Sequence, residues 1–303
     1  MMAAIQIRRL KKRYGDTEVL KNITMDIYPG EIFGFVGHNG AGKSTLIHAL
    51  TGITHTSSGA FEILGFRDDQ IDDAKKEIGV MPDVSNLYEN MKGISFLKYM
   101  GDLAGSRLSK EDYISLMADV GLEGAEWKKI KSYSFGMKKK ISLAQALLGN
   151  PRIIILDEPT SGLDPESAIR VRQLILKLKQ QGKTILLTSH NLDEIEKISD
   201  RVGILADGVI KMIGAPSELK NNEKLIQLKI RTKPMLLEPE IAYLNKQLAL
   251  EINFSQTKDG YSVVTLRTEE DIPLLSKTLI EADYLIYEIK IEQQSLEDVF
   301  LNI

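Results

Sequence analysis

Residues 37–45 carry the strongest chemical signal in the chain, because they complete the pattern G-x-x-x-x-G-K-[ST] of a phosphate loop. In such a loop the backbone N–H groups converge on phosphate oxygens, the lysine contacts the β- and γ-phosphates, and the serine hydroxyl binds Mg²⁺. The alternative is a glycine turn that merely enters a helix. We predict a nucleoside triphosphate site formed by Gly37, His38, Asn39, Gly40, Ala41, Gly42, Lys43, Ser44 and Thr45.

Two elements must position this loop. The apolar residues 32–36 precede it and predict a buried strand, whereas residues 45–50 predict a helix that ends at Gly52. The N-terminus of that helix adds positive potential where the phosphates bind. This order of strand, loop and helix separates a working phosphate loop from a chance match.

Two acids, Asp157 and Glu158, directly follow a second apolar run at 152–156. Ligands of α/β sheets bind at the carboxyl ends of the strands. We therefore predict that Asp157 holds Mg²⁺ opposite Ser44, and that Glu158 is the general base that orients the water attacking the γ-phosphate. The alternative is a solvated turn at the end of a strand.

His190 follows a third buried strand, predicted at 184–188. This position at a strand's carboxyl end predicts a contact with the γ-phosphate, so we place His190 with Lys43 and Glu158 among the catalytic residues. The alternative is a histidine satisfied at the surface or in the core. The other histidines form no cluster with acidic residues that would indicate a zinc site.

The composition limits the class of protein. The chain has 303 residues, 43% of them hydrophobic, which suffices for one large and one smaller domain. A net charge of -3 shows no footprint for nucleic acid, and the lack of cysteine excludes disulfides and thiol chemistry. No apolar stretch has the length of a transmembrane helix. We expect a soluble, cytoplasmic chain whose membrane role would require a partner.

The order of the elements predicts an α/β fold. Apolar strands alternate with helices such as 166–181, which indicates a parallel sheet, and residues 1–30 predict an antiparallel strand pair before the phosphate loop. Residues 202–213 predict a hairpin around an Asp-Gly turn. Between about 85 and 150 the pattern is helical, which we interpret as a helical insertion in this P-loop NTPase core.

A domain boundary is predicted near residues 216–224, dividing the chain into domains 1–220 and 221–303. The second domain is predicted as a small α+β module with the ferredoxin-like order β-α-β-β-α-β. Its predicted strands and helices share alternating or helical apolar spacing and lie at about 225–231, 239–249, 250–254, 261–267, 269–282 and 284–290.

Taken together, these residues resemble the ATPase subunit of an ATP-binding cassette (ABC) transporter over about 1–220. Tyr14 resembles the aromatic residue that stacks on adenine, although a plain strand aromatic would look the same. Residues 134–137, Ser-Phe-Gly-Met, match the family's signature loop in position. Residues 161–164 are similar to the loop that communicates between subunits, and His190 matches the switch histidine.

The resemblance implies that Ser134 and Gly136 contact the γ-phosphate of a partner subunit's ATP. It thus implies a head-to-tail dimer, homo- or heteromeric, that closes around ATP and Mg²⁺ and hydrolyses the ATP. It also implies an integral membrane permease as partner, which would place the chain on the cytoplasmic face of the cell membrane, with no nucleic-acid partner. Two alternatives remain: a soluble ABC-type ATPase that remodels nucleic acid or ribosomes, and a nucleotide-sensing module with little turnover.

The chain departs from the family pattern at two places. Phe135 and Met137 replace the first glycine and the glutamine of the signature loop, a form that resembles the branch exporting drugs, peptide antibiotics or sodium. Asp83 stands where the family has a glutamine that contacts Mg²⁺ and senses the permease. The ending at 294–301, which includes Ser-Leu-Glu-Asp-Val-Phe, is similar to that of such exporters, although an ordinary amphipathic helix has the same spacing.

Two basic clusters lie at 8–13 and 138–140. They could face anionic lipids or a loop of the permease. The interpretation that we favour is that they are solvated faces of a strand and a helix.

Overall fold

The computed structural model describes residues 2–220, 226–236, 253–256, 260–266, 268–292 and 296–301. The chain forms two compact units, 1–216 and 217–302. The strands of the first unit are β1 (Ile5–Tyr14), β2 (Thr17–Ile27), β3 (Ile32–Val36), β4 (Ser58–Ile63), β5 (Phe66–Arg67), β6 (Ile78–Val80), β7 (Ile153–Asp157), β8 (Thr184–Ser189), β9 (Arg201–Ala206) and β10 (Val209–Gly214). Its helices are α1 (Lys43–Leu50), α2 (Ile71–Ala74), α3 (Gly93–Leu103), α4 (Lys110–Asp119), α5 (Phe135–Ala146), α6 (Pro165–Gln180) and α7 (Leu192–Ile198), and α8 (Pro216–Lys220) follows.

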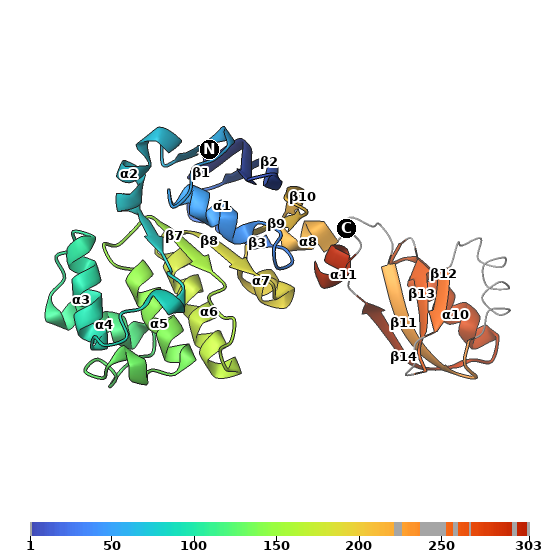
Figure 1. Ribbon diagram of the computed structural model, residues 1–303. Coiled ribbons are helices and arrows are strands. Elements are labelled where there is room, and N and C mark those ends of the chain that lie inside the picture. The colour runs from blue at the N-terminus through green and yellow to red at the C-terminus, as the bar shows by residue number, and fades with distance from the viewer. Residues whose placement is uncertain are drawn as a thin grey trace. The chain divides into compact units, whose positions relative to one another are not determined.

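A six-stranded sheet in the order β10-β9-β3-β8-β7-β6 forms the centre of the first unit (Figure 1). Neighbouring strands from β9 to β6 are parallel, and β10 pairs antiparallel with β9. The residues of β3 and almost all of β7 and β8 are buried, because helices and a second sheet cover both faces. This arrangement explains why the strands appear in the sequence as continuous apolar runs, and the predicted parallel α/β core is confirmed.

The second sheet is antiparallel, in the order β2-β1-β4-β5, and confirms the strand pair predicted within residues 1–30. Helix α1 contributes Leu46 and Leu50 to a core that also contains Ile5 from the antiparallel sheet and Phe33 and Ile155 from the central sheet. The helix that leaves the phosphate loop is therefore anchored by apolar packing against both sheets.

The predicted helical region contains α3, α4 and α5, which gather at the end of the unit opposite β1 and β2 (Figure 1). The predicted helix at 166–181 corresponds to α6, whose N-cap Asp164 accepts a hydrogen bond from Ser167 N at 2.9 Å. The predicted hairpin at 202–213 corresponds to β9 and β10. The positions of α6 and of the β9–β10 hairpin could thus be predicted from a local N-cap residue and a local Asp-Gly turn.

Gly79 in β6 allows the helix α5 to pack closely on the edge of the central sheet. A Cβ at this position would lie 1.8 Å from Ala146 O and 2.8 Å from Pro151 Cγ. Gly79→Ala should therefore lower the free energy of unfolding of the first unit by about 3 kcal/mol. Urea unfolding followed by the fluorescence of Trp127 measures this, because the chain has one tryptophan and it lies in this unit.

The matched control is Gly149→Ala. Gly149 has φ +75° and open space where a Cβ would lie, so the substitution brings backbone strain without a clash and should cost about 1 kcal/mol. Equal losses for the two variants would contradict the close approach at Gly79.

The second unit contains an antiparallel sheet in the order β12-β13-β11-β14, formed by Ile226–Lys233 (β11), Asn253–Gln256 (β12), Ser262–Leu266 (β13) and Leu285–Glu292 (β14). Helix α10 (Asp271–Glu281) packs Leu275 and Leu279 onto one face of this sheet, and α11 is Leu296–Leu301. These strands and α10 match the predicted ferredoxin-like order, while the helix predicted at 239–249 lies outside the described residues. The division at 220/221 stays a prediction.

Candidate functional site

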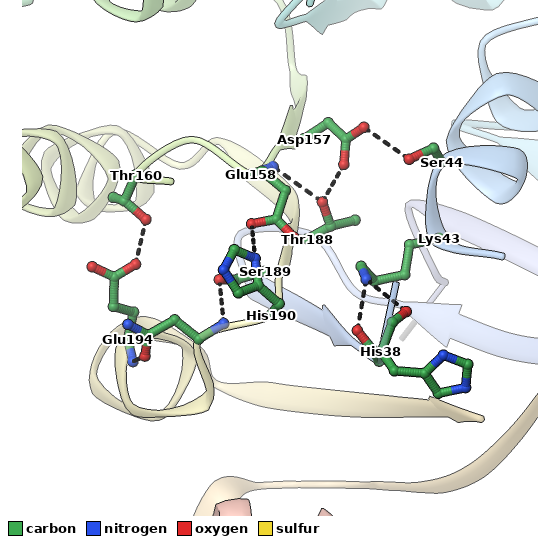
Figure 2. Close-up of polar contacts among 12 residues, drawn as sticks. His38, Lys43, Ser44, Asp157, Glu158, Thr160, Thr188, Ser189, His190 and Glu194 are labelled. Atoms are coloured by element: carbon green, nitrogen blue, oxygen red, sulfur yellow. Dashed lines mark hydrogen bonds and ion pairs between the residues drawn. The ribbon is translucent and has the colours of Figure 1, made fainter. Parts of the chain in front are cut away.

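The ends of three neighbouring strands bring the candidate residues to one edge of the central sheet. Strands β3, β8 and β7 are adjacent and parallel, so their carboxyl ends point the same way. The phosphate loop follows β3, Asp157 ends β7 with Glu158 after it, and His190 follows β8. Figure 2 shows these side chains converging on one region.

The phosphate loop owes its shape to glycines with positive φ, +84° at Gly40 and +112° at Gly42. Lys43 is 7% exposed, and its ammonium donates to Gly37 O at 2.6 Å and His38 O at 3.2 Å (Figure 2). Burial lowers the pKa of Lys43 from its ordinary value, while Glu158 and Asp157 oppose that shift. The ammonium group of Lys43 therefore lies across the loop that must receive phosphate.

Ser44 and Asp157, both predicted to hold Mg²⁺, lie together: Ser44 Oγ donates to Asp157 Oδ2 at 3.1 Å. The other carboxylate oxygen, Oδ1, accepts from the hydroxyl of Thr188, the residue paired with Asp157 in the parallel register. One hydroxyl and one carboxylate suit a hard cation that takes its remaining ligands from phosphate and water, so these residues fit Mg²⁺. No cluster of three or more His, Cys, Asp or Glu able to hold a metal occurs within the described ranges.

Glu158 and His190, the candidate general base and switch histidine, are in contact. His190 Nδ1 lies 2.8 Å from Glu158 Oε2, so with the carboxylate ionised Nδ1 carries the proton and donates it (Figure 2). Glu158 has φ +50°, a conformation that costs a non-glycine residue about 1–2 kcal/mol. Its N–H donates to Thr188 O at 3.2 Å and Thr188 Oγ1 at 3.1 Å, which holds this turn in place.

The residues predicted to contact adenine and a partner's phosphate are on the surface. Tyr14 ends β1, is 49% exposed, and has the Lys12 ammonium 4.7 Å from the centre of its ring. Ser134 is exposed and serves as the N-cap of α5, because its Oγ accepts from Met137 N at 3.2 Å. Gly136 lies in the first turn of the same helix. Tyr14 and Ser134 are accessible to a nucleotide or a second subunit, whereas Gly136 is half-buried.

Comparison with known proteins identifies the family. The model of the ABC transporter family matches residues 20–161. The ABC transporter ATP-binding protein YdbJ of Bacillus subtilis, itself uncharacterised, is 33% identical over 98% of this chain and 94% of its own length. The chain belongs to the ATP-binding proteins of ABC transporters. It is therefore an ATPase of the P-loop class, and the resemblance seen in its sequence is confirmed.

Other relatives of this ABC protein carry names that refer to antibiotics. The linearmycin resistance ATP-binding protein LnrL of Bacillus subtilis is 30% identical over 99% of this chain and 97% of its own length. The lantibiotic transport ATP-binding protein SrtF of Streptococcus pyogenes is 34% identical over 75% of this chain and 97% of its own. A solved structure described as the ATP binding subunit of an ABC transporter aligns with a TM-score of 0.66 at 29% identity, covering 72% of this chain and 92% of that one.

Among the residues that the structure describes, no helix has the length and apolar character needed to cross a membrane.

The departure at Phe135 from the family's signature loop has a packing partner. A Cβ on Gly162 would lie 2.7 Å from the Phe135 ring, so the ring rests against the bare backbone of the loop after β7. Gly162 has φ +75°, and a Cβ on Gly136 would lie 3.3 Å from Leu163 Cδ2. The signature loop and the loop at 161–164 therefore form one packed surface, which neither stretch of sequence reveals alone.

Asp83, the second departure, lines a cleft of about 880 Å³ together with Ser44, Lys139, Asp157 and Glu158. Its Oδ1 accepts from Ser85 N at 2.8 Å and caps a short 3-10 turn at 84–86. Hydrogen bonding by the Ser85 side chain and backbone, with a smaller effect of Lys139, lowers the pKa of Asp83 from its ordinary value. Asp83 is thus an ionised group on the wall of the cleft, with its carboxylate already engaged by the backbone.

Two features of the site were not predicted. Lys139 was grouped with a solvated basic face at 138–140, and for this residue the prediction is wrong: it is 8% exposed and donates to the main-chain carbonyl of Glu158. Glu194 on α7 accepts from Thr160 and from Arg172 Nη1, the latter at 2.9 Å, which ties the loop after β7 to the helix after His190. The run of three lysines gives no sign that its middle member is buried.

Proposed function

We propose that this chain is the Mg²⁺-dependent ATP-hydrolysing subunit of an export-type ABC transporter. The observation that carries the proposal is the paired geometry at the sheet edge, where Ser44 meets Asp157 and His190 meets Glu158. A site built only to sense nucleotide needs the first pair but not the second. The names of the relatives LnrL and SrtF support an export role, with an antibiotic-like compound as one class of cargo.

Binding begins at the phosphate loop. Lys43 exchanges its hydrogen bonds to the carbonyls of residues 37 and 38 for contacts with the β- and γ-phosphates. The phosphates give this buried cation partners of opposite charge. Ser44 and Asp157 would hold Mg²⁺, which would supply positive charge against the negative charge that develops on the phosphates. Tyr14, exposed at the end of β1, stacks on adenine.

Hydrolysis depends on Glu158 and His190. A water attacks the γ-phosphorus and loses its proton to the Glu158 carboxylate, while the bond from that phosphorus to the bridging oxygen breaks and ADP leaves with the electron pair. With a proton on each ring nitrogen, His190 donates from Nδ1 to the Glu158 carboxylate, 2.8 Å away, and from Nε2 to the γ-phosphate. The histidine therefore links recognition of the γ-phosphate to the orientation of the base.

The assembly consists of two ATPase subunits, homo- or heteromeric, and a separate membrane permease. Ser134 and Gly136 cap the γ-phosphate of the partner subunit's ATP, and the exposure of Ser134 at the start of α5 supports this role. ATP has higher affinity for the closed dimer, so its binding shifts the population toward closure and hydrolysis reverses the shift. The chain acts on the cytoplasmic face of the cell membrane.

Purification of the tagged chain from gently solubilised native membranes tests this assignment, with mass spectrometry of what accompanies it. A stoichiometric polytopic membrane protein is the expected result. Recovery with ribosomes or nucleic acid, and with no membrane subunit, would instead support the alternative of a soluble ATPase that remodels those partners.

Asp83 is proposed as the sensor of the permease and a contributor to the Mg²⁺ shell. We expect Asp83→Ala to retain basal hydrolysis but to lose most of its stimulation by the permease, because the substitution removes both the charge and the cap on Ser85 N. Asp83→Asn is the matched variant, since asparagine keeps the cap and removes only the charge. The ATPase rate of each variant is measured alone and with permease-containing membranes; unchanged stimulation in both variants excludes the sensor role.

A further inference from the structure

Lys139 is a buried cation that reaches the catalytic centre from the helix of the signature loop. It lies on α5, whose N-cap is Ser134, and its side chain is 8% exposed. Its ammonium donates to the main-chain carbonyl of Glu158. Its Nζ also lies over the Phe135 ring, 5.8 Å from the centre of the ring. A residue of the helical region thus binds the backbone of the proposed general base.

The main chain of Glu158 is held at both ends of the residue. Its N–H is bound by Thr188 of β8, at 3.2 Å to the carbonyl and 3.1 Å to the hydroxyl, and its carbonyl is bound by Lys139. Between these contacts the residue adopts φ +50°, which side chains rarely accept without restraint. The direction of the Glu158 carboxylate depends on this backbone, so the acceptor Thr188 and the donor Lys139 together determine where the base points.

The electrostatic surroundings keep Lys139 in place. Burial lowers its pKa from the ordinary value, while the nearby carboxylates of Glu158, Asp157, Asp83 and Glu194 raise it. Buried charges of this kind are retained where they are paired and hydrogen-bonded. The ammonium is hydrogen-bonded to the carbonyl of Glu158, and the surrounding carboxylates favour its charged form.

We propose that Lys139 is a positioning residue for ATP hydrolysis, which holds the left-handed turn at Glu158 so that its carboxylate meets the attacking water. This inference rests on the proposed role of Glu158 as general base. It also assigns a second function to the signature helix: α5 presents Ser134 at its start and, a little over one turn later, restrains the base of its own subunit. Movement of α5 would therefore change the direction of the Glu158 carboxylate.

The test uses the purified full-length chain and steady-state ATPase kinetics. Lys139→Met keeps the aliphatic stem and removes the donor and the charge, and we expect kcat to fall about 10- to 100-fold, the usual effect of misplacing a catalytic group. Affinity for a fluorescent ATP analogue should stay within about threefold, because Lys139 does not contact nucleotide in this scheme. Lys139→Arg and Lys139→Gln, which still donate a hydrogen bond, should recover part of the rate.

Two controls separate positioning from a structural role. Lys140→Met removes the neighbouring lysine and should leave kcat near wild type. In the Glu158→Gln background Lys139→Met should lower the residual turnover no further, because residues acting as one unit are not additive. The same fold loss in that background, or a loss shared by Lys140→Met, would overturn the proposal.

The two variants also distinguish a failure of the role proposed for Lys139 from a failure of the role proposed for Glu158. Wild-type hydrolysis by Lys139→Met together with a strong defect in Glu158→Gln would reject Lys139 and keep the base. Wild-type hydrolysis by Glu158→Gln would reject the base, and with it the reason for Lys139. If Lys139→Met fails to fold, Lys139→Leu, which likewise has no donor, carries the same comparison.

Discussion

Glu158→Gln is expected to bind ATP as well as wild type while its turnover falls by about 10²–10⁴-fold, the range for loss of a general base. Glutamine has the size of glutamate and can still accept a hydrogen bond from His190 Nδ1, which lies 2.8 Å from the carboxylate. It cannot take the proton of the attacking water. The defect should therefore appear in kcat and leave nucleotide affinity unchanged.

Steady-state phosphate release and titration with a fluorescent ATP analogue together measure this separation. Glu166→Gln is a suitable control, because Glu166 is a surface residue of α6 paired with Arg170 at 2.6 Å. The control should hydrolyse ATP at the wild-type rate. Hydrolysis by Glu158→Gln at that rate would remove Glu158 from the role of base.

The central sheet and the phosphate site could be predicted because their signals are local. A buried parallel strand needs an unbroken apolar run, and a phosphate loop needs glycines where φ is positive, as at Gly40 and Gly42. Since the carboxyl ends of parallel strands share one edge, the sequence order also places Asp157 and His190 near the loop. The contact of Thr188 with Asp157 was not predicted, because it depends on the register between β7 and β8, which only the structure shows.

Contacts between distant segments could not be predicted in this way. The burial of Lys139 depends on how α5 packs against the end of β7, and a run of three lysines normally indicates a solvated face. In the sequence alone Phe135 is a departure from the signature loop, and only the structure shows that its ring packs against Gly162. In both cases the determining neighbour lies about 20 or more residues away, where periodicity carries no information.

Asp83 stands between these cases. Its hydrogen bond to Ser85 N is a local cap of a kind that aspartate forms readily, so its backbone role was accessible from the sequence. Its place in the cleft with Lys139 was not, because that depends on the packing of α5. Asp83 brings a negative charge where the family has a neutral glutamine. The buried cation Lys139, which lines the same cleft, offsets part of that charge.

Lys43→Ala is expected to weaken ATP binding by about 10²–10³-fold, the effect of removing one partner of a buried charge pair. In the structure Lys43 donates to Gly37 O and His38 O. Truncation therefore removes the phosphate contact and also the restraint on the loop that forms it. Both losses act on affinity, so unlike Glu158→Gln this variant should fail before the chemical step.

Lys43→Met separates the two losses, because it keeps the buried stem but has no donor. If the charge dominates, Met and Ala should bind the fluorescent ATP analogue equally weakly, with thermal stability closer to wild type for Met. Recovery of binding by Lys43→Arg to a level between these variants and wild type would show that a positive charge alone is not enough, since guanidinium cannot reproduce the compact geometry of ammonium in this loop. Near wild-type affinity in Lys43→Ala would contradict the phosphate loop itself, and every role assigned downstream of it.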